Sequence, residues 1–177
     1  WPTTRAKIEA LMPLDRVRWI IAQHQDPDAV GALRDVARDI PGPPSLISHW
    51  RVHTITKSYG ADLPEVRVEE HGWQLTLGGR TLEFVLTPYA HFPGAFATFD
   101  RRTGTLFTSD LFGAFTEGFA LYAEGPSYFD HAQPFHEHYM PSREVLLHAI
   151  EQFRQLPVAR IAPQHGSIIE GDLVAYM

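Results

Sequence analysis

Histidines and aspartates occur in four short segments of the chain whose spacing suits a metal site. The first segment, His24-Gln25-Asp26-Pro27-Asp28, places three potential ligands at alternate positions, which project to the same side of an extended turn. The other segments are His91-Phe92-Pro93-Gly94, Ser109-Asp110-Leu111-Phe112-Gly113 and Gln164-His165-Gly166. The six candidate metal ligands are His24, Asp26, Asp28, His91, Asp110 and His165. Imidazole and carboxylate donors of this kind suit zinc, iron or manganese.

A simpler interpretation of the first segment competes with the metal site. Asp26-Pro27-Asp28 could be a turn followed by a helix cap, with His24 a hydrogen-bonded residue at a sheet edge. The three other segments have their polar residues in matching positions, just past predicted strands. This agreement favours the metal site.

Each candidate segment follows a predicted strand. These strands cover residues 17–22, 81–86, 105–108 and 158–161, as apolar or alternating runs. Residues just past strand ends lie along one edge of a sheet, so segments that are distant in the sequence can converge there.

Strands alternate with helices and with hairpins along the sequence, which predicts an α/β fold with a mixed sheet. They predict a helix from an Asp28 N-cap to about Arg38 and a short helix over residues 50–59 that stops at Gly60. Ser142 opens the clearest amphipathic helix. The other predicted elements are a strand at 45–48 and hairpins that pair 73–77 with 81–86 and 96–99 with 105–108.

The amino-acid composition argues against several classes of partner and of metal site. The 177 residues include 15 basic and 21 acidic residues, for a net charge of -6, and no run of Lys or Arg. This charge argues against a nucleic-acid or anionic-membrane partner. No apolar stretch is long enough to cross a bilayer, no signal peptide is visible, and cysteine is absent. We therefore expect a cytoplasmic protein without thiolate or iron–sulfur sites.

The order of the candidate ligands resembles that of the metallo-β-lactamase superfamily. Longer phrases are similar to the flavodiiron proteins and the related oxygen-binding di-iron proteins within that superfamily. These phrases are Pro88-Tyr89-Ala90-His91-Phe92-Pro93-Gly94, Thr108-Ser109-Asp110-Leu111-Phe112-Gly113-Ala114-Phe115, Tyr139-Met140-Pro141-Ser142 and Gln164-His165-Gly166-Ser167-Ile168-Ile169. The phrase around Asp110 is the most specific of them.

This resemblance implies a fold, a cofactor and ligand roles. The fold would be a metallo-β-lactamase-like αββα sandwich with mixed sheets, forming a single di-metal domain over residues 1–177. Its N-terminal part would be missing, so that the chain is a fragment. Two iron ions would be bound, with zinc or manganese as alternatives. One metal would be held by His24, Asp26 and His91, the other by Asp28 and His165, and Asp110 would bridge both.

Two positions depart from the family pattern. Asp26 stands where the hydrolase branch has histidine and the flavodiiron branch usually has glutamate, and Ala29 stands where many members have a histidine. Three carboxylates harden the ligand set and raise its negative charge, which favours iron over zinc. Because Ala29 cannot ligate, the second metal would keep open positions for a water or a small diatomic.

The sequence is compatible with three functions. The first is an oxidoreductase module that binds and reduces dioxygen or nitric oxide. The second is an oxygen sensor that signals to an attached domain, and the third is a di-zinc hydrolase acting on an ester, thioester or phosphoester. The residues around Asp110, together with Asp26 and Ala29, disfavour the hydrolase. An electron-donor protein or an attached signalling domain would be the protein partner, and a homodimer is a further expectation.

The remaining histidines and three aromatic residues are interpreted as having no role in metal binding. His49 and His53 are four residues apart, but an amphipathic helix explains them better than a zinc pair. His131, His136 and His138 are interpreted as surface or partner-facing residues. Three aromatic residues that could lie over the pocket are more often core residues, namely Phe112, Tyr122 and Tyr139.

Overall fold

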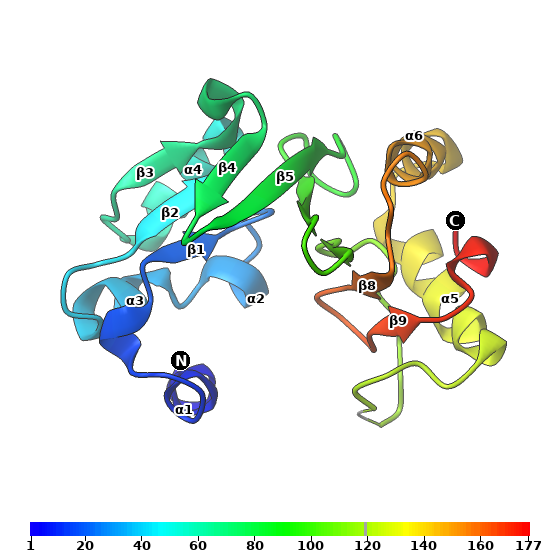
Figure 1. Ribbon diagram of the computed structural model, residues 1–177, viewed down its shortest axis with the longest axis horizontal. Coiled ribbons are helices and arrows are strands. Elements are labelled where there is room, and N and C mark those ends of the chain that lie inside the picture. Colours follow the sequence, from blue (N-terminus) through cyan, green and yellow to red (C-terminus); the bar gives the residue numbers. More distant parts are fainter. Residues whose placement is uncertain (119) are drawn as a thin grey trace. The chain divides into compact units, whose positions relative to one another are not determined.

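The computed structural model describes residues 1–118 and 120–177, and they form two compact units, Trp1–Glu70 and His71–Met177. Figure 1 shows the chain coloured from its blue N-terminus to its red C-terminus. Each unit has its own sheet. The prediction of a single domain over the whole chain stays a prediction.

The first unit is built on a three-stranded parallel sheet in the order β1-β2-β3. Its strands are β1 (Trp19–Ile21), β2 (Ser45–Ser48) and β3 (Glu65–Arg67). Parallel neighbours cannot be joined by a tight turn, so helices occupy both connections. The predicted strand at residues 45–48 is confirmed, and that at 17–22 is confirmed over its central residues.

The helices of the first unit are α1 (Pro2–Glu9), α2 (Pro27–Val30), α3 (Leu33–Asp39) and α4 (Trp50–Thr56). A small apolar cluster of Leu14, Val36 and Ile40 joins α3 to the segment before β1. Helix α4 continues as a 3-10 turn to Tyr59 and ends at Gly60, which has the left-handed φ of 72° that favours glycine. The predicted helix and its stop at Gly60 are therefore confirmed.

The second unit is built on a six-stranded mixed sheet in the order β4-β5-β6-β7-β8-β9. Its strands are β4 (Gln74–Leu77), β5 (Arg80–Leu86), β6 (Phe96–Asp100), β7 (Thr105–Phe107), β8 (Arg160–Ala162) and β9 (Ile169–Glu170). Neighbouring strands are antiparallel except β7 and β8, which are parallel. Both predicted hairpins are present, and the turn of the first uses Gly78 and Gly79 at positive φ.

Two helices, α5 (Phe129–Tyr139) and α6 (Arg143–Phe153), lie in the connection from β7 to β8 and are drawn in yellow and orange in Figure 1. Ser142 caps α6 by accepting a hydrogen bond from the Val145 N–H, as the sequence predicted. The buried face of α6 places Ala149 and Phe153 in the core of this unit. Complete burial of a side chain such as Phe153 contributes about 1.5–3 kcal/mol.

The sequence did not predict three short elements that lack a periodic pattern of apolar residues. Helix α1 buries no residue, β3 has three residues of which two are charged, and β9 has only two residues. Such elements carry little hydrophobic periodicity because they are very short or bury no apolar face.

Among the described residues, none of the helices has the length and apolar character needed to cross a bilayer.

Candidate metal centre

Three of the six candidate ligands lie at one edge of the second unit's sheet. Strand β5 is antiparallel to β6, β6 is antiparallel to β7, and β7 is parallel to β8. Strands β5, β7 and β8 therefore point the same way, and the loops that follow them leave the sheet at the same edge. These loops carry His91, Asp110 and His165.

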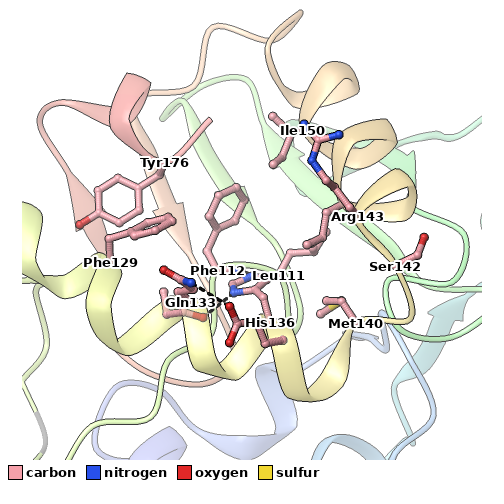
Figure 2. Close-up of a pocket in the computed structure, with 13 residues that line it drawn as sticks. Leu111, Phe112, Phe129, Gln133, His136, Met140, Ser142, Arg143, Ile150 and Tyr176 are labelled. Atoms are coloured by element: carbon pink, nitrogen blue, oxygen red, sulfur yellow. Dashed lines mark hydrogen bonds between the residues drawn. The ribbon is translucent and has the colours of Figure 1, made fainter.

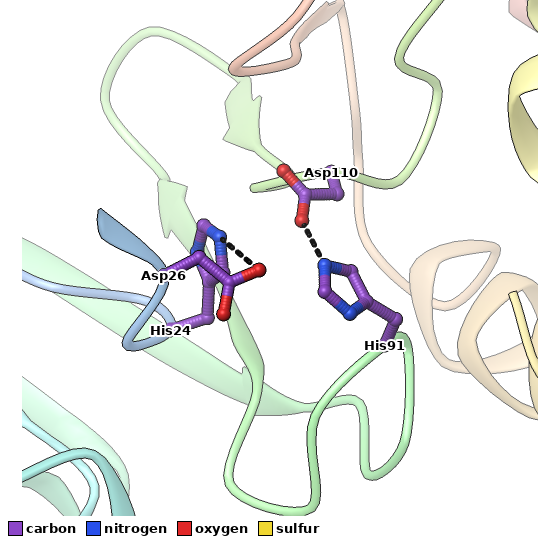
Figure 3. Close-up of side chains that lie close together, drawn as sticks. All are labelled: His24, Asp26, His91 and Asp110. Carbon is purple, nitrogen blue, oxygen red and sulfur yellow. Dashed lines mark ion pairs between the residues drawn. The ribbon is translucent and has the colours of Figure 1, made fainter. Parts of the chain in front are cut away.

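Asp110 lies between the other two of these side chains. Its carboxylate is 5% exposed, with Oδ2 2.7 Å from His91 Nε2 and Oδ1 3.4 Å from His165 Nε2. Figure 3 shows the His91–Asp110 contact as a dashed line. Each carboxylate oxygen thus faces a different imidazole from a different loop.

The backbone around Asp110 is held in an uncommon conformation. Ser109 has a φ of 56° and Phe112 a φ of 65°, in the left-handed region that residues other than glycine rarely adopt. Such residues cost on the order of 1–3 kcal/mol each and persist where the surroundings fix them. Here the Gln164 N–H donates to the Ser109 carbonyl at 2.8 Å, and the Thr108 hydroxyl donates to the Leu111 carbonyl at 2.6 Å.

Aromatic rings pack against both imidazoles of this group. The Tyr139 ring centroid is 5.8 Å from that of His91, and the Phe135 centroid is 5.7 Å from that of His165. Phe135 and Tyr139 are themselves 4.6 Å apart on α5. These contacts restrict rotation of the imidazoles. Of the three aromatic residues considered from the sequence, Phe112 is buried, whereas Tyr122 and Tyr139 are 47% and 44% exposed.

In the first unit, His24 and Asp26 form a second pair, also drawn in Figure 3. His24 is 2% exposed, and its Nε2 lies 3.9 Å from Asp26 Oδ2. Gln25 Nε2 donates to the other Asp26 oxygen at 2.6 Å. The start of this turn is tied to β2, because the Ala22 carbonyl accepts the Ser48 hydroxyl and the Ala22 N–H donates to the Ile47 carbonyl.

Asp28 and Ala29 are exposed residues of α2. The prediction that Asp28 caps this helix is wrong, because the N-cap is Asp26 and Asp28 lies in the first turn. Proline is favoured at the first helical position, so Pro27 starts the helix two residues earlier than predicted. The predicted helix to Arg38 is also divided into α2 and α3, with Gly31 and Ala32 between them.

The histidines outside this set have distinct environments. His49 is the N-cap of α4, where its Nδ1 accepts the Arg51 N–H at 3.3 Å, and His53 is buried beside Glu65. Burial lowers the pKa of both imidazoles. His131 and His138 are exposed on α5.

The prediction that His136 faces the surface is wrong. Its ring Nε2 accepts the Phe112 N–H at 2.8 Å, and its Nδ1 lies 2.7 Å from the Ala132 carbonyl. Burial lowers the pKa of this imidazole. The sequence offered one signal, since His136 follows Ala132 and Phe135 on the buried side of α5.

The six candidate ligands are three imidazoles and three carboxylates, donor types that suit hard or intermediate divalent metals. With two divalent ions, the three carboxylates leave a net charge of +1. The buried Asp110 supports this fit, because an anionic group away from water needs cationic or hydrogen-bonding partners.

The family model described as "ODP family beta lactamase" matches residues 1–166. The chain belongs to the ODP beta-lactamase family. Family membership confirms the predicted place in the metallo-β-lactamase superfamily and its flavodiiron branch.

Similar proteins include two longer chains. The type A flavoprotein fprA of Rhodobacter capsulatus is 28% identical over 97% of this chain, and coenzyme F420H(2) oxidase of Methanothermobacter thermautotrophicus is 32% identical over 86% of it. This ODP-family chain spans 40% of the length of each of these relatives.

Solved structures share the fold. The flavodiiron protein of Giardia intestinalis superposes with a TM-score of 0.88 at 20% identity, over 97% of this chain and 44% of that one. The structure of a peroxy diiron species of the chemotaxis sensor ODP gives a TM-score of 0.86 at 22% identity, over 98% of this chain and 74% of that one. The predicted metallo-β-lactamase-like α/β fold with mixed sheets is thereby confirmed.

Proposed function

We propose that this domain holds two iron ions and uses them to bind or reduce dioxygen or nitric oxide. The proposed ligands are His24, Asp26, Asp28, His91, Asp110 and His165. The observation that carries the proposal is Asp110, a buried carboxylate whose two oxygens each face an imidazole from a separate loop. A pair of bound ferrous ions would supply electrons and open coordination positions for a diatomic ligand.

The ligand roles follow from the residue types and from the family. We assign His24, Asp26 and His91 to one metal, Asp28 and His165 to the other, and Asp110 to both. The carboxylates compensate the charge of the metals, and three of them favour iron over zinc.

The surrounding residues orient these ligands. Tyr139 and Phe135 limit the rotation of His91 and His165 and keep part of their surface away from water. The bonds from Gln164 and Thr108 hold the backbone that carries Asp110. Ala29 adds no imidazole next to Asp28, so access to that metal would stay open.

Relatives support two uses of the same centre. One relative is named an oxidase and a structural neighbour is a chemotaxis sensor, and the family that matches is that of the sensor. We propose reversible binding with signalling to an attached domain as the first use, and reduction with electrons from a partner protein as the second.

The experiment is anaerobic reconstitution with ferrous iron and, separately, with zinc. We expect about two irons per chain by elemental analysis and an optical change when the reduced protein is mixed with dioxygen or nitric oxide. His131→Ala is the matched control, because this histidine is exposed and lies outside the proposed ligand set, so its metal content should not change.

Three outcomes contradict the proposal in different ways. One metal per chain or none would overturn the dinuclear site. Uptake of two zinc ions without iron would favour a hydrolase. Two irons without any reaction toward either gas would refute the proposed chemistry while leaving the metal site intact.

A further inference from the structure

The loop that carries Asp110 contains a buried backbone N–H that its own turn does not use. The Gly113 N–H donates to the Asp110 carbonyl at 3.0 Å, so residues 110–113 form a four-residue turn. Phe112 occupies its third position with a φ of 65°, where glycine or asparagine is normally found. Phe112 is 5% exposed, and a buried N–H without an acceptor costs about 1–3 kcal/mol.

His136 supplies the acceptor for this N–H. Its Nε2 lies 2.8 Å from the Phe112 nitrogen, as the dashed line in Figure 2 shows. A backbone N–H can only donate, so Nε2 must be unprotonated. The ring proton therefore sits on Nδ1, which lies 2.7 Å from the Ala132 carbonyl, a group that can only accept. Both contacts are satisfied by one neutral tautomer and by no other protonation state.

Helix α5 supports the turn at a second point. A Cβ added to Gly113 would lie 2.7 Å from the Phe135 ring, so the helix and the turn are in close contact. Phe135 and His136 are consecutive in α5, and they contact the consecutive turn residues Gly113 and Phe112. The turn is thus fixed by packing on one side and by a hydrogen bond on the other.

The His136 ring is partly buried. The ring lines an apolar cavity of about 420 Å³ together with Leu111, Phe112, Met140 and other residues of α5 and α6, shown in Figure 2. The surroundings disfavour the imidazolium, and the pKa of His136 is accordingly lowered. The neutral ring that the two contacts require is therefore the form that burial favours.

From this geometry we infer that His136 is a positioning residue, which holds the Asp110 turn in the conformation that presents both carboxylate oxygens. The inference rests on the proposed metal site, since it is the metal affinity of Asp110 that His136 would tune. His136 acts on the Asp110 turn through the Phe112 backbone. Its role resembles that of outer-shell hydrogen bonds to ligands, whose loss typically lowers metal affinity about 10–100-fold.

The first test uses the metal-free chain. Nitrogen NMR of the His136 ring should show the neutral tautomer protonated on Nδ1, and the Phe112 amide should be protected from hydrogen exchange. In His136→Leu, which has no acceptor, that amide should exchange at least about tenfold faster, corresponding to the loss of about 1.4 kcal/mol. A ring protonated on Nε2, or unchanged protection in the variant, would overturn the inference.

The second test measures ferrous-iron affinity by competition with a chromophoric chelator. His136→Leu should weaken binding about 10–100-fold. His136→Gln should restore most of the affinity, because a glutamine side-chain oxygen can accept the Phe112 N–H. His148→Leu, an exposed histidine on α6, is the matched control and should bind iron like the parent chain.

The outcomes separate the inference from the proposed function. Unchanged iron affinity in His136→Leu, with the Phe112 amide exposed, would overturn the positioning role while the metal site stands. Loss of affinity in His136→Gln equal to that in His136→Leu would also overturn it, since packing alone would then explain the effect. A parent chain that binds no iron would refute the proposed function, whereas the ring tautomer and the amide protection still decide whether His136 holds the turn. If His136→Leu does not fold, these two measurements and His136→Gln keep the inference testable.

Discussion

In the second unit, the loops that carry Asp110 and His165 are joined by a backbone hydrogen bond, and the Asp110 loop is also bonded to α5. The candidate ligands of the first unit lie instead on a short turn and on the four-residue helix that follows it. In the second unit, Asp110 is 3% exposed and its turn is fixed by Gln164, Thr108 and His136. Of the three candidate ligands in the first unit, His24 is buried, the Asp26 side chain is 33% exposed, and Asp28 is exposed.

This difference indicates distinct contributions to a metal site. A ligand that is already held in place before the metal binds loses little conformational entropy on binding. Asp110 should therefore contribute most to the affinity for metal. A carboxylate on an exposed turn must be ordered when the metal binds, and it should contribute less. The comparison thus predicts a ranking of substitutions.

The largest effect is expected from Asp110→Asn. The amide keeps the shape of the carboxylate but loses its charge and one acceptor oxygen, so both metals should be affected together. We expect the apparent affinity for iron to fall by at least about a hundredfold, which is more than for the loss of a hydrogen bond that only orients a ligand. Two metals bound with unchanged affinity, measured by chelator competition, would show that Asp110 does not bridge.

An intermediate effect is expected from Asp26→Ala and Asp28→Ala, which should each weaken one of two binding steps and leave the other. We expect a loss of about tenfold in the affected step, because these carboxylates are partly or fully exposed and start from a less ordered state. Isothermal titration under anaerobic conditions would separate the two steps. Loss of both metals in either variant, to the extent expected for Asp110→Asn, would remove the distinction between the units.

The smallest effect is expected in the dependence of stability on pH, and it compares the buried His53 of the first unit with the partly buried His136 of the second. Burial lowers the pKa of His136 and of His53 in the folded chain. As the pH falls through the ordinary histidine pKa of about 6.5, the unfolded chain takes up a proton that the folded chain does not, so stability is lost toward acid. The slope is at most about 1.4 kcal/mol per pH unit for each such group.

Glutamine does not titrate in this range, so His136→Gln and His53→Gln should both lose less stability between pH 7 and pH 5.5 than the parent chain does. Urea unfolding of the metal-free proteins measures this. Glu137 and Arg143 line the cavity beside His136, and His53 lies beside Glu65 and Arg67, so these charges should be kept in all variants. A parent chain whose stability is unchanged over this interval would contradict the prediction. Of the two variants, only His136→Gln touches the Asp110 turn.

The sequence predicted the strands and helices that carry strong periodicity and the polar segments that follow them. Residues 45–48, both hairpins and the Ser142 helix appear as expected, because their apolar patterns match the faces that are buried. The helix cap at Asp28 was wrong, because two aspartates flank Pro27 and local preference did not choose between them. The surface assignment of His136 was wrong, because its partner is a backbone N–H 24 residues earlier in the sequence.

The sequence by itself determined the types of metal-binding side chain. With ten histidines and no cysteine, the chain offers imidazole and carboxylate ligands but no thiolate. It also determined that three of these ligands follow strands, because hydrophobic runs end just before them. Only the tertiary structure decided that β5, β7 and β8 point the same way, since strand order and direction depend on pairing between distant segments. It alone also showed that His136 accepts the N–H of Phe112, a residue with left-handed backbone, because the two residues are far apart in the sequence.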